Sequence, residues 1–110
     1  KETKEIEKIK LDAKKLEKAG CFSIVLEKIP SKLAEEITKS VKIPVIGIGA
    51  GSKVDGQVLV MHDMLGLNND FNPRFLRRYC DLSSIIQKAV SNYIQDVKDQ
   101  KFPNKNEEYH

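Results

Sequence analysis

The stretch Cys21-Phe22-Ser23-Ile24-Val25-Leu26 decides the fold, because it is a short apolar run rich in β-branched residues. A run of this kind predicts a buried β-strand, which ends at Glu27. Pro30 opposes any continuation of the strand, and Ser31 is predicted to cap a helix that follows. The inward face of that helix is predicted to hold three apolar residues, Leu33, Ile37 and Val41.

Two more buried strands are predicted further along the chain, at residues 45–48 and 57–61. The first closes into Gly49-Ala50-Gly51, and the second runs into His62-Asp63. Asp55-Gly56 reads as the turn that precedes the second of these strands.

Helices are predicted both before and after the strands in the sequence. Residues 1–20 form an amphipathic pattern that Gly20 can end by adopting the left-handed conformation. Residues 84–100 form a longer helix, and Pro73 opens a short one after a loop at 68–70. The first helix has one apolar face, made of Ile6, Ile9, Ala13, Leu16 and Gly20. Around the short helix lie Phe71, Phe75, Leu76 and Tyr79. The inward residues of the last helix are predicted to be Ile85, Ile86, Ala89, Val90, Tyr93, Ile94 and Val97.

The order of elements predicts an α/β protein whose parallel sheet is covered by helices on both faces. Three strands make a small sheet, so the chain is either a very small α/β domain or the trailing part of a larger one. The first helix begins without a cap, which favours the trailing part. Residues 1–103 are then one segment of a larger α/β domain, and residues 104–110 are a polar tail.

Composition excludes several classes of protein. The 110 residues carry 19 Lys and Arg against 16 Asp and Glu, and no apolar run approaches the roughly 18 residues of a membrane span. The only arginines are Arg74, Arg77 and Arg78, which argues against nucleic-acid binding. Cys21 and Cys80 lack metal-binding spacing and are expected to be reduced thiols of an intracellular protein.

Glu27 is the candidate catalytic residue, because it stands where the strand pattern favours an apolar side chain. A carboxylate that is partly desolvated at a strand exit becomes a better general base. The alternative is a solvated glutamate paired with Lys28 or Lys53.

The glycine-rich strand end at 47–51 has the spacing GxGxG, which is not the dinucleotide-binding fingerprint. Its backbone N–H groups can approach an anion or a carbonyl, or the glycines can simply allow a tightly packed turn. His62 and Asp63 point to opposite faces of a strand, so they are not expected to share a metal ion.

Several stretches together resemble ketopantoate hydroxymethyltransferase, in the order and at the spacing of that family. They are Asp12-Ala13-Lys14-Lys15-Leu16-Glu17-Lys18-Ala19-Gly20, Val25-Leu26-Glu27-Lys28-Ile29-Pro30, Ile43-Pro44-Val45-Ile46-Gly47-Ile48-Gly49-Ala50-Gly51 and Asp55-Gly56-Gln57-Val58-Leu59-Val60-Met61-His62-Asp63. The resemblance covers residues 10–103, and it is specific as a combination rather than in any single piece.

The resemblance implies that this chain is the carboxyl-terminal part, about strands six to eight, of a (β/α)8 TIM barrel. It implies transfer of a hydroxymethyl group from 5,10-methylenetetrahydrofolate to the keto acid 3-methyl-2-oxobutanoate, giving 2-dehydropantoate on the route to pantothenate. Glu27 falls on the proton acceptor of the family, whereas His62 and Asp63 are expected only to support the structure. In such a barrel Glu27, the turn at 49–51 and His62-Asp63 would share one rim.

The same resemblance implies a Mg²⁺ ion that holds the keto acid, with ligands in amino-terminal strands that have no counterpart here, so no metal ligand is assigned in this chain. It also implies a homo-oligomer in the cytoplasm, or in an organelle such as the mitochondrion, with no nucleic-acid or membrane partner.

Two other functions remain open from the sequence. One is a different barrel enzyme that binds phosphate at the glycine turn, since phosphate sites often follow strands seven and eight. The other is a non-catalytic assembly fragment whose open strand edges and apolar faces associate with a partner.

Overall fold

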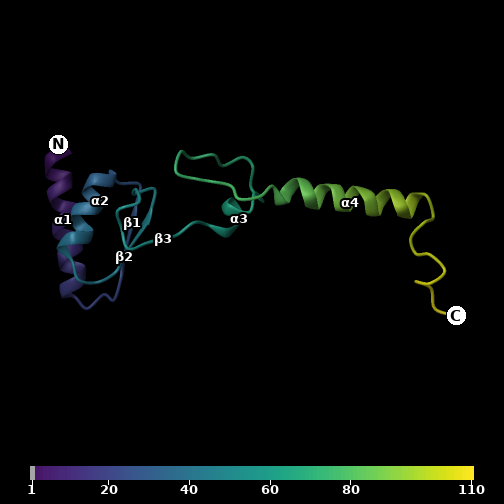
Figure 1. Ribbon diagram of the computed structural model, residues 1–110, viewed down its shortest axis with the longest axis horizontal. Coiled ribbons are helices and arrows are strands. Elements are labelled where there is room, and N and C mark those ends of the chain that lie inside the picture. Colours follow the sequence, from purple (N-terminus) through teal and green to yellow (C-terminus); the bar gives the residue numbers. More distant parts are fainter. Residues whose placement is uncertain (1) are drawn as a thin grey trace. The chain divides into compact units, whose positions relative to one another are not determined.

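A computed structural model describes residues 2–110. The chain forms two compact units (Figure 1). The first unit contains residues 2–60 and Pro73–Leu76, and the second contains Met61–Asn72 and Arg77–His110.

The first unit is an α/β structure with a small parallel sheet, as the sequence predicts. Its elements are α1 (Glu2–Lys18), β1 (Ile24–Glu27), α2 (Ser31–Ser40), β2 (Val45–Ile48) and β3 (Gly56–Gln57). The strands lie in the order β1-β2-β3, and both neighbouring pairs are parallel. The carboxyl ends of all three strands therefore lie at one edge of the sheet.

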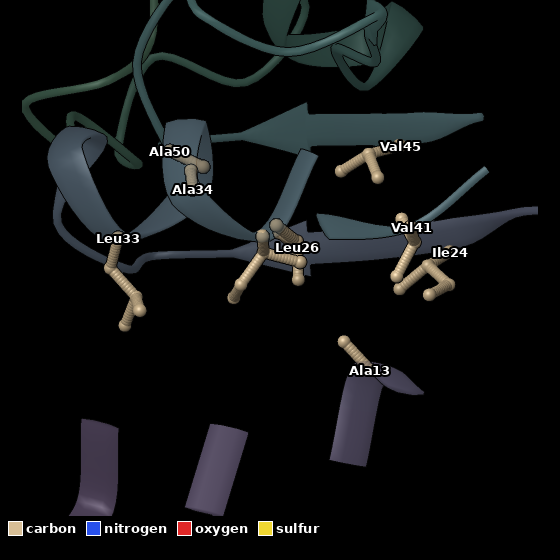
Figure 2. Packing of buried hydrophobic residues seen from close by; sticks show 9 residues of the cluster. Ala13, Ile24, Leu26, Leu33, Ala34, Val41, Val45 and Ala50 are labelled. Carbon is tan, nitrogen blue, oxygen red and sulfur yellow. The ribbon is translucent and has the colours of Figure 1, made fainter. Parts of the chain in front are cut away.

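The core of the first unit lies between the sheet and its helices, which contact one another (Figure 1). In Figure 2 the Ala13 side chain on α1 points toward the strands, and Ile24 and Leu26 lie on the side of β1 that faces α1. Ile37 of α2 and Val45 of β2 are completely buried. The full core is Ala13, Ile24, Leu26, Leu33, Ala34, Ile37, Val41, Val45 and Ala50.

The opposite face of the sheet carries no helix of the first unit, so the prediction of helices on both faces is wrong for the described residues. Side chains alternate between faces along a strand, and Val25 pairs with Ile46 while Glu27 pairs with Ile48. Val25 is 62% exposed on this face. Sequential parallel strands joined by crossovers of one hand keep their helices on one side, which explains the arrangement.

The end of α1 is fixed by Gly20 and Glu17. Gly20 has φ +98, the left-handed conformation that the sequence predicted. The carboxylate of Glu17 accepts hydrogen bonds from the backbone N–H groups of Lys42 and Ile43, and these bonds lower the pKa of that carboxyl. Leu16, predicted to be buried, is 44% exposed, because the buried contacts of α1 with the core end at Ala13.

The boundaries of β1 and α2 differ from those predicted. Residues 21–23 connect Gly20 to the strand rather than forming part of it, and the Ser23 hydroxyl donates to the Pro44 carbonyl at 3.0 Å. Ser31 is the first residue of α2, and Pro30 is the N-cap with no side-chain cap bond. The helix thus begins with the fixed φ of proline rather than with a serine cap.

The third strand is much shorter than the predicted 57–61. The Val58 N–H still donates to the Gly47 carbonyl at 3.0 Å, but β2 ends at Ile48 and the chain turns at Gly49. Residues 59–61 therefore have no strand to pair with. Met61 instead begins the short helix α3 (Met61–Met64), which contains His62 and Asp63.

The second unit contains α3 and α4 (Leu82–Lys98). The helix α4 begins two residues before the predicted Ser84, because Asp81 is its N-cap and accepts hydrogen bonds from the Ser84 N–H and hydroxyl. These bonds lower the pKa of Asp81. No residue of α4 is buried, so the predicted inward face is wrong for the described residues. Ile85, for example, is 60% exposed.

The short helix predicted at Pro73 is absent from the described residues, which form a single turn with a Leu76 N–H to Pro73 carbonyl bond of 3.1 Å. The predicted loop at 68–70 is present, and Arg78 organises it. The Arg78 guanidinium donates to the Asn72 side-chain oxygen at 2.6 Å and to the Asn68 and Phe71 carbonyls at 3.0 Å. These three bonds connect Arg78 to both ends of the loop that precedes Pro73.

We expect Ile37→Ala to lower the free energy of unfolding of the first unit by about 2–5 kcal/mol, because it removes a completely buried side chain and leaves a cavity. Val25→Ala, on the open face, should change it by less than about 0.5 kcal/mol. Urea unfolding of the two variants measures the difference. Equal losses would contradict the assigned core.

Glu17→Gln should reduce the loss of stability in acid. The folded pKa of Glu17 lies below its unfolded value, so its contribution is present above the unfolded pKa and disappears as the pH falls through the folded one. The difference in unfolding free energy between neutral and acidic pH should therefore be smaller in Glu17→Gln than in the wild type. Urea unfolding of both proteins at the two pH values measures this, and an equal difference would contradict the role of Glu17.

Candidate functional site

The candidate site lies at the carboxyl edge of the sheet. Glu27 is the last residue of β1 and pairs with Ile48, the last residue of β2. The turn Gly49-Ala50-Gly51 follows directly, so the structure brings together Glu27 and the glycine turn as the sequence predicted. Carboxyl edges of parallel strands are the usual place for functional groups in α/β folds.

Glu27 is exposed on the open face of the sheet. The desolvation expected from the sequence is therefore not supplied by this chain, because α1 and α2 cover the other face of the sheet. The alternative pairing with Lys28 or Lys53 is also not seen among residues 2–110, where the ion pairs within 4.0 Å do not include Glu27. Its carboxylate is thus free of cationic side chains in the described part of the chain.

Lys28, the next residue, turns the chain away from the strand. It has φ 51, and its N–H donates to the Ile48 carbonyl at 2.9 Å. The ammonium of Lys28 lies 5.7 Å from the centroid of the Phe75 ring, within the range of a cation–π contact. No local pattern of residues indicates this contact, because Phe75 is distant along the chain.

The glycine turn is tightly packed against its neighbours. A Cβ at Gly49, which has φ +64, would lie 3.1 Å from the Phe75 ring, and one at Gly51, with φ +83, would lie 2.4 Å from the Ser31 Cβ. The Gln57 amide donates to the Gly51 carbonyl at 2.7 Å. These contacts support the packed-turn interpretation of the glycines over an anion site.

Asp55 has a role that the sequence did not reveal. Its carboxylate accepts a hydrogen bond of 2.9 Å from the Val45 N–H, and its own N–H donates to the Val45 carbonyl at 3.0 Å. The residue therefore closes the amino end of β2 and sets the register of β3, beyond forming a turn. An Asp-Gly pair before an apolar run was the available signal, and it indicates only a turn.

His62 and Asp63 lie in α3 of the second unit, and Asp63 is buried while His62 is exposed. Their placement on a rim with Glu27 stays a prediction. Cys21 and Cys80 are both free, as predicted.

The described residues do not supply a metal site. Residues 2–110 contain no group of three or more His, Cys, Asp or Glu side chains that could hold a metal ion. None of the helices in this range is long and apolar enough to cross a membrane.

Comparison with known proteins identifies the family. The family model described as ketopantoate hydroxymethyltransferase matches residues 1–105. The chain belongs to the ketopantoate hydroxymethyltransferase family. A 3-methyl-2-oxobutanoate hydroxymethyltransferase of Christiangramia forsetii is 63% identical over 109 residues, and one of Flavobacterium johnsoniae is 60% identical over 109 residues.

This member of the ketopantoate hydroxymethyltransferase family spans about 40% of the length of the curated relatives it matches. Each of these two matches covers 99% of the chain. A relative from Bacteroides thetaiotaomicron with the same name is 59% identical, with the same coverage of both proteins.

Gly51→Ala should destabilise this family member more than Gly20→Ala does. Both glycines have positive φ, so each substitution carries the left-handed strain of about 1–2 kcal/mol. Only Gly51 also meets a neighbour, since nothing lies within 4 Å of a Cβ at Gly20. Urea unfolding of both variants tests this, and equal losses would contradict the packing of the turn on Ser31.

Proposed function

We propose that this chain is the carboxyl-terminal part of a 3-methyl-2-oxobutanoate hydroxymethyltransferase, with β1, β2 and β3 as about strands six to eight of a (β/α)8 barrel. Three facts support the proposal: the family match, the share of the relatives' length that the chain spans, and the one-sided sheet. In a barrel the helices cover the outer face and the inner face is filled by side chains of other strands. The open face of Val25 and Ile46 suits that inner position.

We propose Glu27 as the proton acceptor. The observation that carries this role is the position of Glu27 at the carboxyl edge, on the open face, with no ion pair among the described residues. Catalytic residues of (β/α)8 enzymes project from this edge. A carboxylate with free oxygen lone pairs can take a proton from a carbon acid placed against it.

The proposed step begins at C3 of 3-methyl-2-oxobutanoate. The C3 proton moves to a carboxylate oxygen of Glu27, and the electrons of the broken C–H bond form an enolate conjugated with the C2 carbonyl. C3 of the enolate then forms a carbon–carbon bond to the one-carbon unit, for which 5,10-methylenetetrahydrofolate is the proposed donor. Hydrolysis of the donor releases this unit as formaldehyde: its two C–N bonds break, water supplies the oxygen, and tetrahydrofolate leaves. The alkoxide formed when C3 adds to formaldehyde takes the proton back from Glu27 and becomes the hydroxyl of 2-dehydropantoate.

A Mg²⁺ ion is implied by the resemblance, but the described residues do not fit it. They offer no group of three candidate ligands, so the proposed ion would be held by the part of the enzyme that this chain does not span, where it would stabilise the enolate. Among the residues of this chain, the proposed proton transfer involves only Glu27.

Glu27→Gln should lower the rate of deuterium exchange at C3 of 3-methyl-2-oxobutanoate by about 10²- to 10⁴-fold, the usual contribution of a general base. The measurement uses proton NMR and a hybrid enzyme in which this chain replaces the matching segment of the Christiangramia forsetii relative. Glu5→Gln, on α1, is the matched control and should exchange at the wild-type rate.

Wild-type exchange in the Glu27→Gln hybrid would disprove the role of Glu27. The same assay on the 110-residue chain alone should show no exchange. Exchange by this chain alone that is lost in Glu27→Gln would show that the site is complete within these residues, and the proposal of a partial barrel would be wrong.

A further inference from the structure

The carboxylate of Glu27 is followed directly in the sequence by an ammonium group, that of Lys28. A cation beside a carboxylate stabilises its charged form and makes it a weaker base. In the described residues this pairing does not occur, since the ion pairs present involve other glutamates and aspartates. Lys53, the other candidate partner, lies near Glu35, whose pKa is lowered mainly by Lys39 and only weakly by Lys53. Other contacts therefore hold the Lys28 ammonium away from the Glu27 carboxylate.

The backbone of Lys28 begins this separation. Its φ of 51 places it in the left-handed region, which is unfavourable for a residue with a Cβ. The hydrogen bond from its N–H to the Ile48 carbonyl, 2.9 Å long, ties this conformation to the end of β2. Because of this turn, Lys28 does not continue the alternation of side chains between the two faces of β1.

The Phe75 ring completes the separation, because the Lys28 ammonium lies 5.7 Å from its centroid. The ring itself is held against the backbone of Gly49, where a Cβ would lie only 3.1 Å from two of its carbon atoms. Phe75 belongs to the segment Pro73–Leu76, which is part of the first unit. Phe75, Lys28 and Gly49 thus form one cluster at the edge of the sheet that carries Glu27.

We propose that Phe75 is a positioning residue for Glu27, since its ring holds the Lys28 ammonium and so leaves the Glu27 carboxylate free to accept a proton. This inference rests on the proposed function of Glu27. Phe75 acts through Lys28 and does not touch the reacting atoms. Gly49 contributes by leaving room for the ring, which gives the glycine turn a role in the same arrangement.

The test combines two substitutions in the hybrid enzyme. Phe75→Leu keeps an apolar side chain against Gly49 but removes the aromatic face, and Lys28→Met removes the charge. Phe75→Leu alone should lower the C3 exchange rate about two- to fivefold, the factor that corresponds to a cation–π contact at an exposed site. In the Lys28→Met background the same substitution should cause no further fall, because no ammonium remains to be released. Phe75→Tyr should retain the wild-type rate.

A second readout uses the 110-residue chain and needs no activity. An aromatic ring shields protons above its face, so the Lys28 side-chain protons should lie upfield in the wild type and move downfield in Phe75→Leu. If Phe75→Leu does not fold, Phe75→Met serves in its place.

Equal falls in exchange for Phe75→Leu in both backgrounds would make Phe75 purely structural and overturn the proposal. No fall in either background, or unmoved Lys28 signals, would overturn it as well. Failure of the proposed function is recognised separately, because Glu27→Gln would then exchange at the wild-type rate whatever the Lys28 signals show.

Discussion

The parallel pairing of β1 with β2, from Ile24 opposite Val45 to Glu27 opposite Ile48, determines where the other groups of the first unit lie. The pairing places alternate residues on a helix-covered face and on an open face. It also brings the last residue of β1 level with the start of the glycine turn. The core and the candidate site are therefore two faces of one hydrogen-bonded ladder, and a shift of register by one residue would exchange them.

The sequence predicts those helices and strands that are determined by a local pattern of apolar and polar residues. The apolar run before Glu27 and the periodicity of α2 required no knowledge of the rest of the chain. The prediction of a strand at 57–61 was wrong in its length, because a strand needs a neighbour to pair with and β2 ends at Ile48. The prediction of an inward face on α4 was wrong for a related reason. An amphipathic pattern predicts that one face can be covered, but nothing in residues 2–110 covers it.

The candidate site shows the same division. The position of Glu27 followed from the end of an apolar run and from the rule that parallel strands share a carboxyl edge. Its surroundings did not follow, because they depend on contacts between distant segments. Phe75 reaches Lys28 only in the folded chain, and Asp55 binds the Val45 N–H across an intervening turn. Contacts between distant segments produce no repeating pattern of residues in the sequence, so they cannot be predicted from it.

The order of the strands along the chain bears on the order in which the chain folds. In the first unit each strand pairs with the next strand along the chain, β1 with β2 across α2 and β2 with β3 across the glycine turn. Contacts between segments close in sequence form with less loss of chain entropy than contacts between distant ones. The segment Pro73–Leu76 joins this unit from further along the chain. The sheet should therefore assemble first and the Phe75 contact with Lys28 last, so that Glu27 gains its proposed surroundings only at the end of folding.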